Sequence, residues 1–386
     1  MLRRPSVSLV AALILMAVLS AIGAGCGTQA SDSYKIGALF AVTGNNSPLG
    51  TPEKETAQML EEQINAKGGI NGHKVQLIVY DTESDETKAV TLAKKLIEQD
   101  NVLAIIGPSS TGESMALIDT VEKAQIPLIS CAASAQITTP VKKWVFKTPQ
   151  SDALAAAEVF DYLKSKGITE VALLASTGGF GVTGKQALEA AAPQYGIKFV
   201  ASESFGDKDT DMTVQLTKIK GTAAKALIVW GTNPGPALIS KNAKQLGLNI
   251  PILDSHGIAN QAFLDLAGDA ANGVILPAGK LLAADTLPDS DPQKSVLLSY
   301  AKDFKAKYNK NADTFGGHAW DAMTMVTNAL AKVGPDKAKI RDELENLKNF
   351  IGISGVFNMS PQDHNGLTKG AFVMITVANG KWTVLK

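Results

Sequence analysis

Apolar and polar positions along the chain follow a pattern typical of strands that alternate with helices. Short apolar runs at 34–41, 74–80 and 102–106 are each followed by a stretch in which apolar residues recur every three or four positions. Ala57, Leu60 and Ile64 show this helical spacing in the first such stretch. Strands that alternate with helices predict a parallel sheet covered by helices on both faces.

The same alternation restarts after residue 148 and continues almost to the C-terminus. The predicted helices cover residues 51–66, 86–99, 153–166, 184–195, 211–220, 236–247, 295–308, 318–333 and 337–347, with a further helical pattern from Met115 to Val121. Further strands are predicted at 126–129, 171–175, 198–202, 226–230, 250–253 and 274–277, and a hairpin at 370–385 around Asn379-Gly380. Two strand–helix series predict two doubly wound α/β lobes with right-handed crossovers.

Polar turns follow two neighbouring predicted strands between residues 102 and 134. The strand at 102–106 ends at Gly107-Pro108 and the hydroxyls that follow, Ser109 to Thr111, and the next strand ends in the small residues 130–134. Ligands settle at the carboxyl edge of open α/β sheets, and the helix N-terminus there favours an anion. We therefore expect half of a small-molecule cleft here, although the same hydroxyls could serve only as turn and N-cap groups.

Length and charge narrow the possible functions. A chain of 386 residues is long enough for two domains, and 45% hydrophobic and 19% charged residues are typical of a globular protein. Lysine plus arginine and aspartate plus glutamate number 37 each. Nucleic acid and anionic membrane surfaces attract proteins with a basic excess, so neither is expected as the main partner.

The first 26 residues have the pattern of an export signal. Arg3 and Arg4 precede an apolar stretch at 7–22, and Gly-Ala-Gly-Cys at 23–26 resembles a bacterial lipobox, although Gly23 stands where leucine is usual. This predicts an exported lipoprotein acylated at Cys26 and tethered to the membrane through residues 27–33. The alternative is an ordinary cleaved signal. Cys131 would be the remaining cysteine, so neither an internal disulfide nor a cysteine-based zinc site is expected.

Several short motifs together resemble the type I periplasmic binding proteins, and most closely the leucine/isoleucine/valine-binding proteins of ABC importers. They are Asn-Ala-Lys-Gly-Gly-Ile-Asn-Gly at 65–72, the strand ending in Tyr80-Asp81, the Ile-Gly-Pro-Ser turn at 106–109 and Ile126-Pro127. The resemblance covers the chain from residue 34 onward. It implies two lobes that close on a ligand, a permease dimer as partner, and neither a cofactor nor a metal.

The resemblance also implies where the lobes divide. Three crossovers are expected near Thr148, Lys280 and Val373. The N-terminal lobe would contain residues 34–148 and 282–372, and the C-terminal lobe residues 149–281 and 373–386.

Carried over position by position, the family's ligand contacts fall on both predicted lobes. The hydroxyl that holds the ligand carboxylate falls on Thr111 with Ser110 beside it, and further contacts fall on Ala132 and Ser134. The aromatic wall of the second lobe falls on Phe180.

The aromatic lid of the first lobe falls on Phe315, but three positions depart from the family. Leu49 and Asn233 stand where aromatic residues are usual, and His256 replaces the acid that pairs with a ligand ammonium. An imidazole cannot replace a carboxylate there, although Asp254 lies two residues away. The resemblance therefore supports a carboxylate ligand, either an amino acid or an aromatic or aliphatic carboxylate without the ammonium.

Other functional classes match the sequence less well than a binding protein does. Gly179 to Gly184 fits Gly-x-Gly-x-x-Gly, with Glu203 at the end of the next strand, which is a local dinucleotide-binding pattern. It lies in the second series of a chain expected to be exported, where such cofactors are scarce. No Gly-x-Ser-x-Gly elbow is present, and His318 with Asp321 is better explained as a local cap. A ligand sensor would use the same fold, but the prediction is a non-enzymatic solute-binding protein of an ABC importer.

Overall fold

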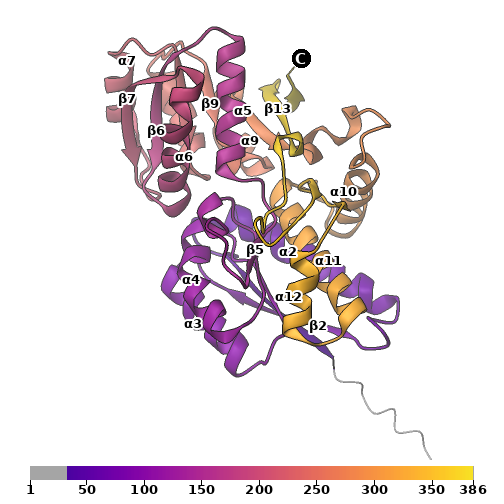
Figure 1. The fold of residues 1–386 in the computed structure, drawn as a ribbon. Coiled ribbons are helices and arrows are strands. Elements are labelled where there is room, and N and C mark those ends of the chain that lie inside the picture. The colour runs from indigo at the N-terminus through magenta and orange to yellow at the C-terminus, as the bar shows by residue number, and fades with distance from the viewer. Residues whose placement is uncertain (1–32, 386) are drawn as a thin grey trace, which may run out of the picture.

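The computed structural model describes residues 33–385, which form two α/β lobes, one above the other in Figure 1. The lower lobe is built on a parallel sheet with the order β2-β1-β3-β4-β5. These strands are β1 (Tyr34–Phe40), β2 (Val75–Asp81), β3 (Ile105–Ile106), β4 (Leu128–Ser130) and β5 (Val145–Lys147). The predicted signal segment at 1–26, Cys26, and all of the tether except Ser33 lie outside the described residues.

The upper lobe is built on a larger sheet with the order β14-β13-β10-β9-β8-β6-β7. Its parallel part contains β6 (Glu170–Ser176), β7 (Lys198–Phe205), β8 (Ala226–Trp230), β9 (Ile252–Asp254) and β10 (Ile275–Gly279). The C-terminal hairpin adds β13 (Phe372–Ala378) and β14 (Lys381–Val384) in the antiparallel sense. Asn379 and Gly380 have φ angles of 52° and 70°, as a type I′ hairpin turn requires.

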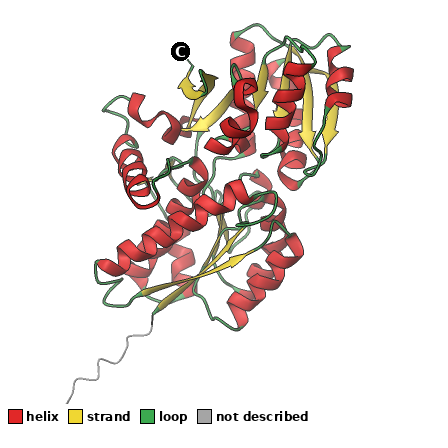
Figure 2. Ribbon diagram, turned by 180° about the vertical axis from the view of Figure 1, so that it is seen from behind, coloured by secondary structure: helices red, strands yellow, loops and turns green. Residues whose placement is uncertain are grey.

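Helices cover both faces of each sheet, as Figure 2 shows. The helices that pack on the first sheet, or on each other beside it, are α2 (Ser47–Ala66), α3 (Glu86–Glu98), α4 (Thr111–Ala124), α10 (Lys294–Tyr308), α11 (Thr314–Val333) and α12 (Lys337–Glu345). Those of the second sheet are α5 (Asp152–Ser165), α6 (Gly179–Tyr195), α7 (Thr213–Lys220), α8 (Gly235–Gln245) and α9 (Gln261–Ala267). A two-stranded ribbon joins β11 (Phe350–Ile351) to β12 (Val356–Phe357). None of the helices between residues 33 and 385 is long and apolar enough to cross a membrane.

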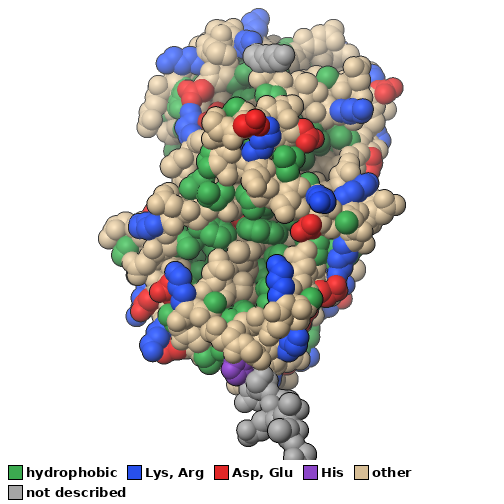
Figure 3. Space-filling model, turned by 90° about the vertical axis from the view of Figure 1, so that its right-hand side faces the viewer, with side chains coloured by type: hydrophobic (Ala, Val, Ile, Leu, Met, Phe, Trp, Pro, Cys, Tyr) green, Lys and Arg blue, Asp and Glu red, His purple; other side chains and the backbone are tan. Residues whose placement is uncertain are grey.

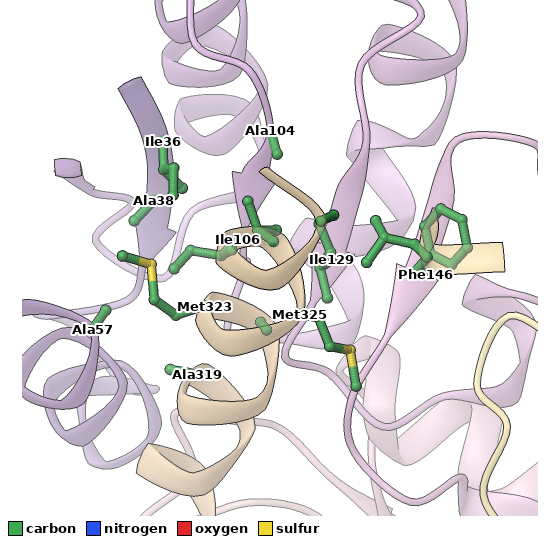
Figure 4. Close-up of a cluster of buried hydrophobic side chains, with 14 of the residues drawn as sticks. Ile36, Ala38, Ala57, Ala104, Ile106, Ile129, Phe146, Ala319, Met323 and Met325 are labelled. Carbon is green, nitrogen blue, oxygen red and sulfur yellow. The ribbon is translucent and has the colours of Figure 1, made fainter. Parts of the chain in front are cut away.

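The core of the first lobe joins parts of the chain that lie far apart in sequence. In Figure 4, Ile36, Ile106 and Ile129 from the strands meet Ala319 and Met323 from α11. All five side chains are completely buried. In Figure 1 the orange α11 and α12 accordingly lie beside the indigo and purple N-terminal elements. The lobe is therefore completed only after the chain has returned from the second sheet.

Buried polar contacts hold the region where the chain passes between the lobes. The chain leaves the first sheet after β5 and enters α5 of the second lobe. On this path Thr148 Oγ1 donates to the backbone oxygen of His318 at 3.0 Å, and Gln150 Nε2 donates to that of Ser354 at 2.6 Å. The segment that leaves the first sheet is thus hydrogen-bonded to the part of the first lobe that comes later in the sequence.

Some predicted boundaries were wrong, mostly at helix starts. The helices expected at 51–66, 184–195 and 318–333 begin at Ser47, Gly179 and Thr314. Glycine and proline near these starts suggested loops, but both residues fit a first helical turn, where backbone N–H groups have no intrahelical partner. The strand expected at 102–106 is a regular strand only over Ile105–Ile106, although the Leu103 N–H also donates to the Lys35 oxygen at 2.9 Å.

Candidate functional site

A cavity lies between the two lobes and is lined by residues of both. The space not occupied by protein atoms, its open mouth included, is about 760 Å³. Figure 3 shows hydrophobic side chains gathered at the level where the lobes meet. The first turns of α4 and α6 reach the cavity from opposite lobes through Thr111 and Gly179. Two helix N-termini therefore face one space.

Six of the eight predicted ligand-binding residues line this cavity: Ser110, Thr111, Ala132, Phe180, His256 and Phe315. Ser134 and Asn233 do not. The Ser134 hydroxyl accepts a hydrogen bond from the backbone N–H of Gln136 at 3.1 Å. The Asn233 amide donates to Asn260 Oδ1 at 3.2 Å, and the neighbouring Thr232 lines the cavity instead. The Ser134 hydroxyl and the Asn233 amide nitrogen are therefore used within the protein, whereas the buried Asn233 Oδ1 makes no hydrogen bond with a described residue.

Thr111 has the features of a ligand-binding hydroxyl. It is the first residue of α4 and is only 2% exposed, yet its Oγ1 makes no hydrogen bond with any described residue. A buried polar atom normally has a partner, because leaving it without one costs free energy. The N–H groups of Thr111 and Gly112 belong to the first helical turn and have no acceptor within the helix. Together these groups can hold an anion such as a carboxylate.

Ser110 has a different role from its neighbour. It is the N-cap of α4, where its hydroxyl donates to Glu113 Oε2 at 2.6 Å and accepts from the Glu113 backbone N–H at 3.4 Å. The Glu113 carboxylate in turn accepts from the Ser110 backbone N–H at 3.2 Å, which completes a capping box. Because its hydrogen is already donated, the Ser110 hydroxyl is not a free donor for an anion.

His256 faces the cavity as a neutral ring inside an aromatic box. The centroid of its ring lies 5.4 Å from that of Phe180, 6.1 Å from that of Trp230 and 5.5 Å from that of Phe372, in edge-to-face arrangements. Burial, helped by the Lys147 charge, lowers its pKa to about 3, and neither ring nitrogen makes a hydrogen bond of ordinary geometry with a described residue. The imidazole is therefore uncharged at neutral pH.

Asp254 does not take the place of the missing acid. It is completely buried and does not line the cavity, and burial raises the pKa of its carboxyl well above the usual value. It therefore offers no negative charge to a ligand in the cavity.

Two carboxylates that line the cavity were not foreseen as site residues. A Cβ atom on Gly112 would lie 2.0 Å from Glu86 Oε1, and one on Gly178 would lie 2.2 Å from Asp207 Oδ2. Each carboxylate thus lies against the first turn of one facing helix. Glu86 is the first residue of α3, and Asp207 follows the end of β7. Neither position carries a sequence signal that would separate it from an ordinary surface acid.

Close packing explains why glycine is present in the Gly-x-Gly-x-x-Gly pattern, without a bound dinucleotide. The pattern lies within α6 and not before it, and a Cβ on Gly184 would lie 1.8 Å from Trp230 Nε1. A Cβ on Gly181 would similarly lie 2.1 Å from the backbone oxygen of Ser176. Close contact between α6 and the sheet therefore explains these glycines. Among the described residues, no group of three or more histidine, cysteine, aspartate or glutamate side chains could hold a metal ion.

Comparison with known proteins agrees with this geometry. The family described as "Periplasmic binding protein" matches residues 33–381. The chain belongs to this family. The leucine-, isoleucine-, valine-, threonine- and alanine-binding protein of Pseudomonas aeruginosa is 27% identical over 340 residues, covering 86% of this chain and 87% of that protein.

Solved structures extend the likeness to the whole two-lobed fold. An extracellular ligand-binding receptor from Rhodopseudomonas palustris HaA2 has a TM-score of 0.87 and 29% identity, covering 92% of this chain and 100% of that one. The branched-chain amino acid transporter substrate binding protein LivJ of Streptococcus pneumoniae, in complex with isoleucine, has a TM-score of 0.81 and 26% identity, covering 92% and 98%. The predicted resemblance and the two-lobed α/β fold are thereby confirmed. At the level of the family, these relatives are binding proteins and not enzymes, and the family implies an exported chain.

Proposed function

We propose that this protein is the solute-binding component of an ABC importer, and that its lobes close on a small ligand bearing a carboxylate. The observation that carries the proposal is the buried Thr111 hydroxyl, which lines the cavity without a hydrogen-bond partner among the described residues. The ligand carboxylate would accept from this hydroxyl and from the N–H groups of Thr111 and Gly112. Hydrogen bonds to a charged group are strong, and they become stronger when closure excludes water. The protein would hold its ligand without converting it.

Two ligand classes are each favoured by one observation. The neutral His256 favours aromatic or aliphatic carboxylates, since its imidazole carries no negative charge to pair with an ammonium. The carboxylates of Glu86 and Asp207 favour an amino acid, because both line the cavity near the helix N-termini where a carboxylate would bind. The aliphatic or aromatic part of either ligand would contact Phe180 and Phe315.

The lobe boundaries and the membrane anchor are part of the same proposal. The N-terminal lobe would comprise residues 34–148 and 282–372, and the C-terminal lobe residues 149–281 and 373–386. Acylation of Cys26 would tether the exported protein beside its permease dimer. Mass spectrometry of the protein purified from its native membrane tests this, since a lipid-modified N-terminal cysteine is expected and an unmodified cleavage product would contradict it.

A matched set of small ligands tests the function and separates the two classes. Thermal unfolding would be followed with L-leucine, with 4-methylpentanoate, which lacks its ammonium, and with 3-methylbutylamine, which lacks its carboxylate. The series L-phenylalanine, 3-phenylpropanoate and 2-phenylethylamine extends the test to aromatic ligands. A bound ligand raises the unfolding temperature by mass action. We expect stabilisation by carboxylates and none by the two amines; stabilisation by the amines alone would contradict the proposal.

A further inference from the structure

Ser109 is a buried serine beside the proposed carboxylate site. Its hydrogen-bond partner determines whether its hydroxyl can donate to a ligand. Ser109 lines the cavity two residues before Thr111 and is 1% exposed. Its Oγ accepts a hydrogen bond from the backbone N–H of Ala41 at 3.0 Å. It is also hydrogen-bonded to the Glu53 carboxyl, which α2 places behind it. Glu53 is completely buried, and its Oε1 makes no hydrogen bond with a described residue.

The protonation state of Glu53 fixes the direction of the hydrogen bond to Ser109. A hydroxyl carries one hydrogen and two lone pairs. If Glu53 is ionised, Ser109 must donate its hydrogen to Glu53, and only a lone pair is left to face the cavity. If Glu53 is neutral, it donates its own hydrogen to Ser109. Ser109 then accepts from both Ala41 and Glu53, and its hydrogen is free for the cavity.

The surroundings of Glu53 favour its neutral form. Burial is the largest influence and raises the pKa of Glu53 well above its usual value. The hydrogen bond with Ser109 acts in the lowering direction without reversing this, and the negative charges of Glu113 and Asp313 add to the rise. Cys131, after β4, is the further titratable group that faces it, and its thiol pKa is itself raised by burial. Among the described groups that act on the pKa of Glu53, none is a cation.

We propose that Ser109 donates its hydroxyl hydrogen to the bound carboxylate, and that Glu53 is the positioning residue that allows this by donating its own proton to Ser109. Thr111 and Ser109 would then hold the carboxylate together from the same polar turn. The proposal rests on the proposed function, because it assigns a further contact for the same ligand. The protonation state of Glu53, which does not itself contact the ligand, would then decide whether Ser109 can donate a hydrogen bond to an anion.

The Ser109 contact is tested by calorimetry with 4-methylpentanoate, 3-phenylpropanoate and L-leucine at neutral pH. Ser109→Ala should weaken binding of whichever probes the wild type binds by about 10- to 100-fold, as expected for a lost hydrogen bond to a charge. Ser114→Ala is the matched control. Ser114 is also a buried serine, bonded to Ser130 Oγ at 2.7 Å and outside the cavity, so affinity should not change. Full affinity in Ser109→Ala overturns the contact.

The role of Glu53 is tested by infrared difference spectra and by the pH dependence of affinity. The difference between wild type and Glu53→Gln should contain the C=O band of a protonated carboxylic acid at neutral pH. Above the pH at which that band disappears, wild-type affinity for the two carboxylate probes should fall about tenfold per pH unit. Glu53→Gln should bind them at neutral pH and show no such fall. A missing band, or the same pH profile in both proteins, overturns the role of Glu53.

The failure of this inference differs from the failure of the proposed function. If Thr111→Val weakens binding and Ser109→Ala does not, the carboxylate site stands and the Ser109 contact is wrong. If none of the three probes binds the wild type, the proposed function fails and this inference fails with it.

Discussion

Gly179 of the second lobe lies directly against the backbone of Gly112 in the first lobe. A Cβ atom on Gly179 would lie 2.8 Å from the Gly112 backbone nitrogen and 3.0 Å from its Cα. The first turn of α6 can approach α4 this closely only because Gly179 lacks a side chain. This contact shapes one wall of the cavity and brings the two lobes together over it.

Replacing Gly179 by alanine should hold the lobes apart. The new Cβ would contact backbone atoms, which cannot move aside like a flexible side chain, so closure should cost about 1–3 kcal/mol of binding free energy. Calorimetry should show weaker ligand binding, and solution scattering should show a larger radius for the ligand-loaded variant than for the loaded wild type. Gly221→Ala is the control, since its Cβ would have only a 3.4 Å contact. Equal affinity and radius in Gly179→Ala would mean that this contact is not part of closure.

Replacing His256 by glutamate should change the ligand class. A carboxylate at this position could pair with an ammonium, so the variant should gain affinity for L-leucine relative to 4-methylpentanoate. In the absence of ligand the variant should be less stable, because the new carboxylate would be buried among aromatic rings without a partner. The ratio of the two affinities is the measurement. An unchanged ratio would place the ligand ammonium elsewhere, with Glu86 and Asp207 as the remaining candidates.

His256 should also make the protein less stable in mild acid. Its pKa is about 3 in the folded protein, against about 6.5 in the unfolded chain. Between these values the unfolded state binds a proton that the folded state does not, so folding stability falls as pH decreases. The loss from pH 7 to pH 5 should be about 2 kcal/mol for this group.

Denaturant unfolding of His256→Gln at both pH values isolates that contribution. Asp313 and Asp321, whose pKa values are raised to about 7 by burial, act in the opposite direction, and His318, with a pKa of about 3, acts in the same direction. All three groups are present in both proteins. Between pH 7 and pH 5, the free energy of unfolding of the variant should therefore fall by about 2 kcal/mol less than that of the wild type. Equal losses would show that His256 is protonated at pH 5 in the folded protein.

Replacing Ser110 by alanine should affect stability and not ligand binding. The variant loses both side-chain bonds of the capping box with Glu113, at a cost of about 0.5–2 kcal/mol in the free energy of unfolding. Unfolding by denaturant measures that cost, and calorimetry should show unchanged ligand affinity. A loss of affinity comparable to that of a Thr111 variant would show that Ser110 contacts the ligand directly.

The fold could be predicted from the sequence because its elements have strong local patterns. The buried strands β1 and β8 are apolar runs, and α5 and α12 end within two residues of their expected limits. Helix starts were harder, since glycine and proline fit both a loop and a first helical turn. The regular part of β3 covers only Ile105–Ile106, but backbone hydrogen bonds to the neighbouring strands extend from Leu103 to Gly107, close to the predicted strand.

The site was predictable only where the chain turns at a sheet edge. Thr111 was found because hydroxyl residues follow a strand and a Gly-Pro step. The role of Glu53 could not be found, because tertiary packing alone brings its helix behind Ser109. Ser134 and Asn233 fit the pattern equally well, but their side chains are used by nearby Gln136 and Asn260. Sequence shows which polar groups lie at the edge, whereas the structure shows which of them remain free.

Calorimetry on Thr111→Val tests the central claim most directly. Valine keeps the shape of threonine and removes a hydroxyl that makes no hydrogen bond with the described protein, so stability without ligand should not fall. Binding of 4-methylpentanoate or 3-phenylpropanoate should weaken by about 1.5–3 kcal/mol, the value of a hydrogen bond to a charged group. Wild-type affinity in Thr111→Val would contradict a carboxylate held at the N-terminus of α4.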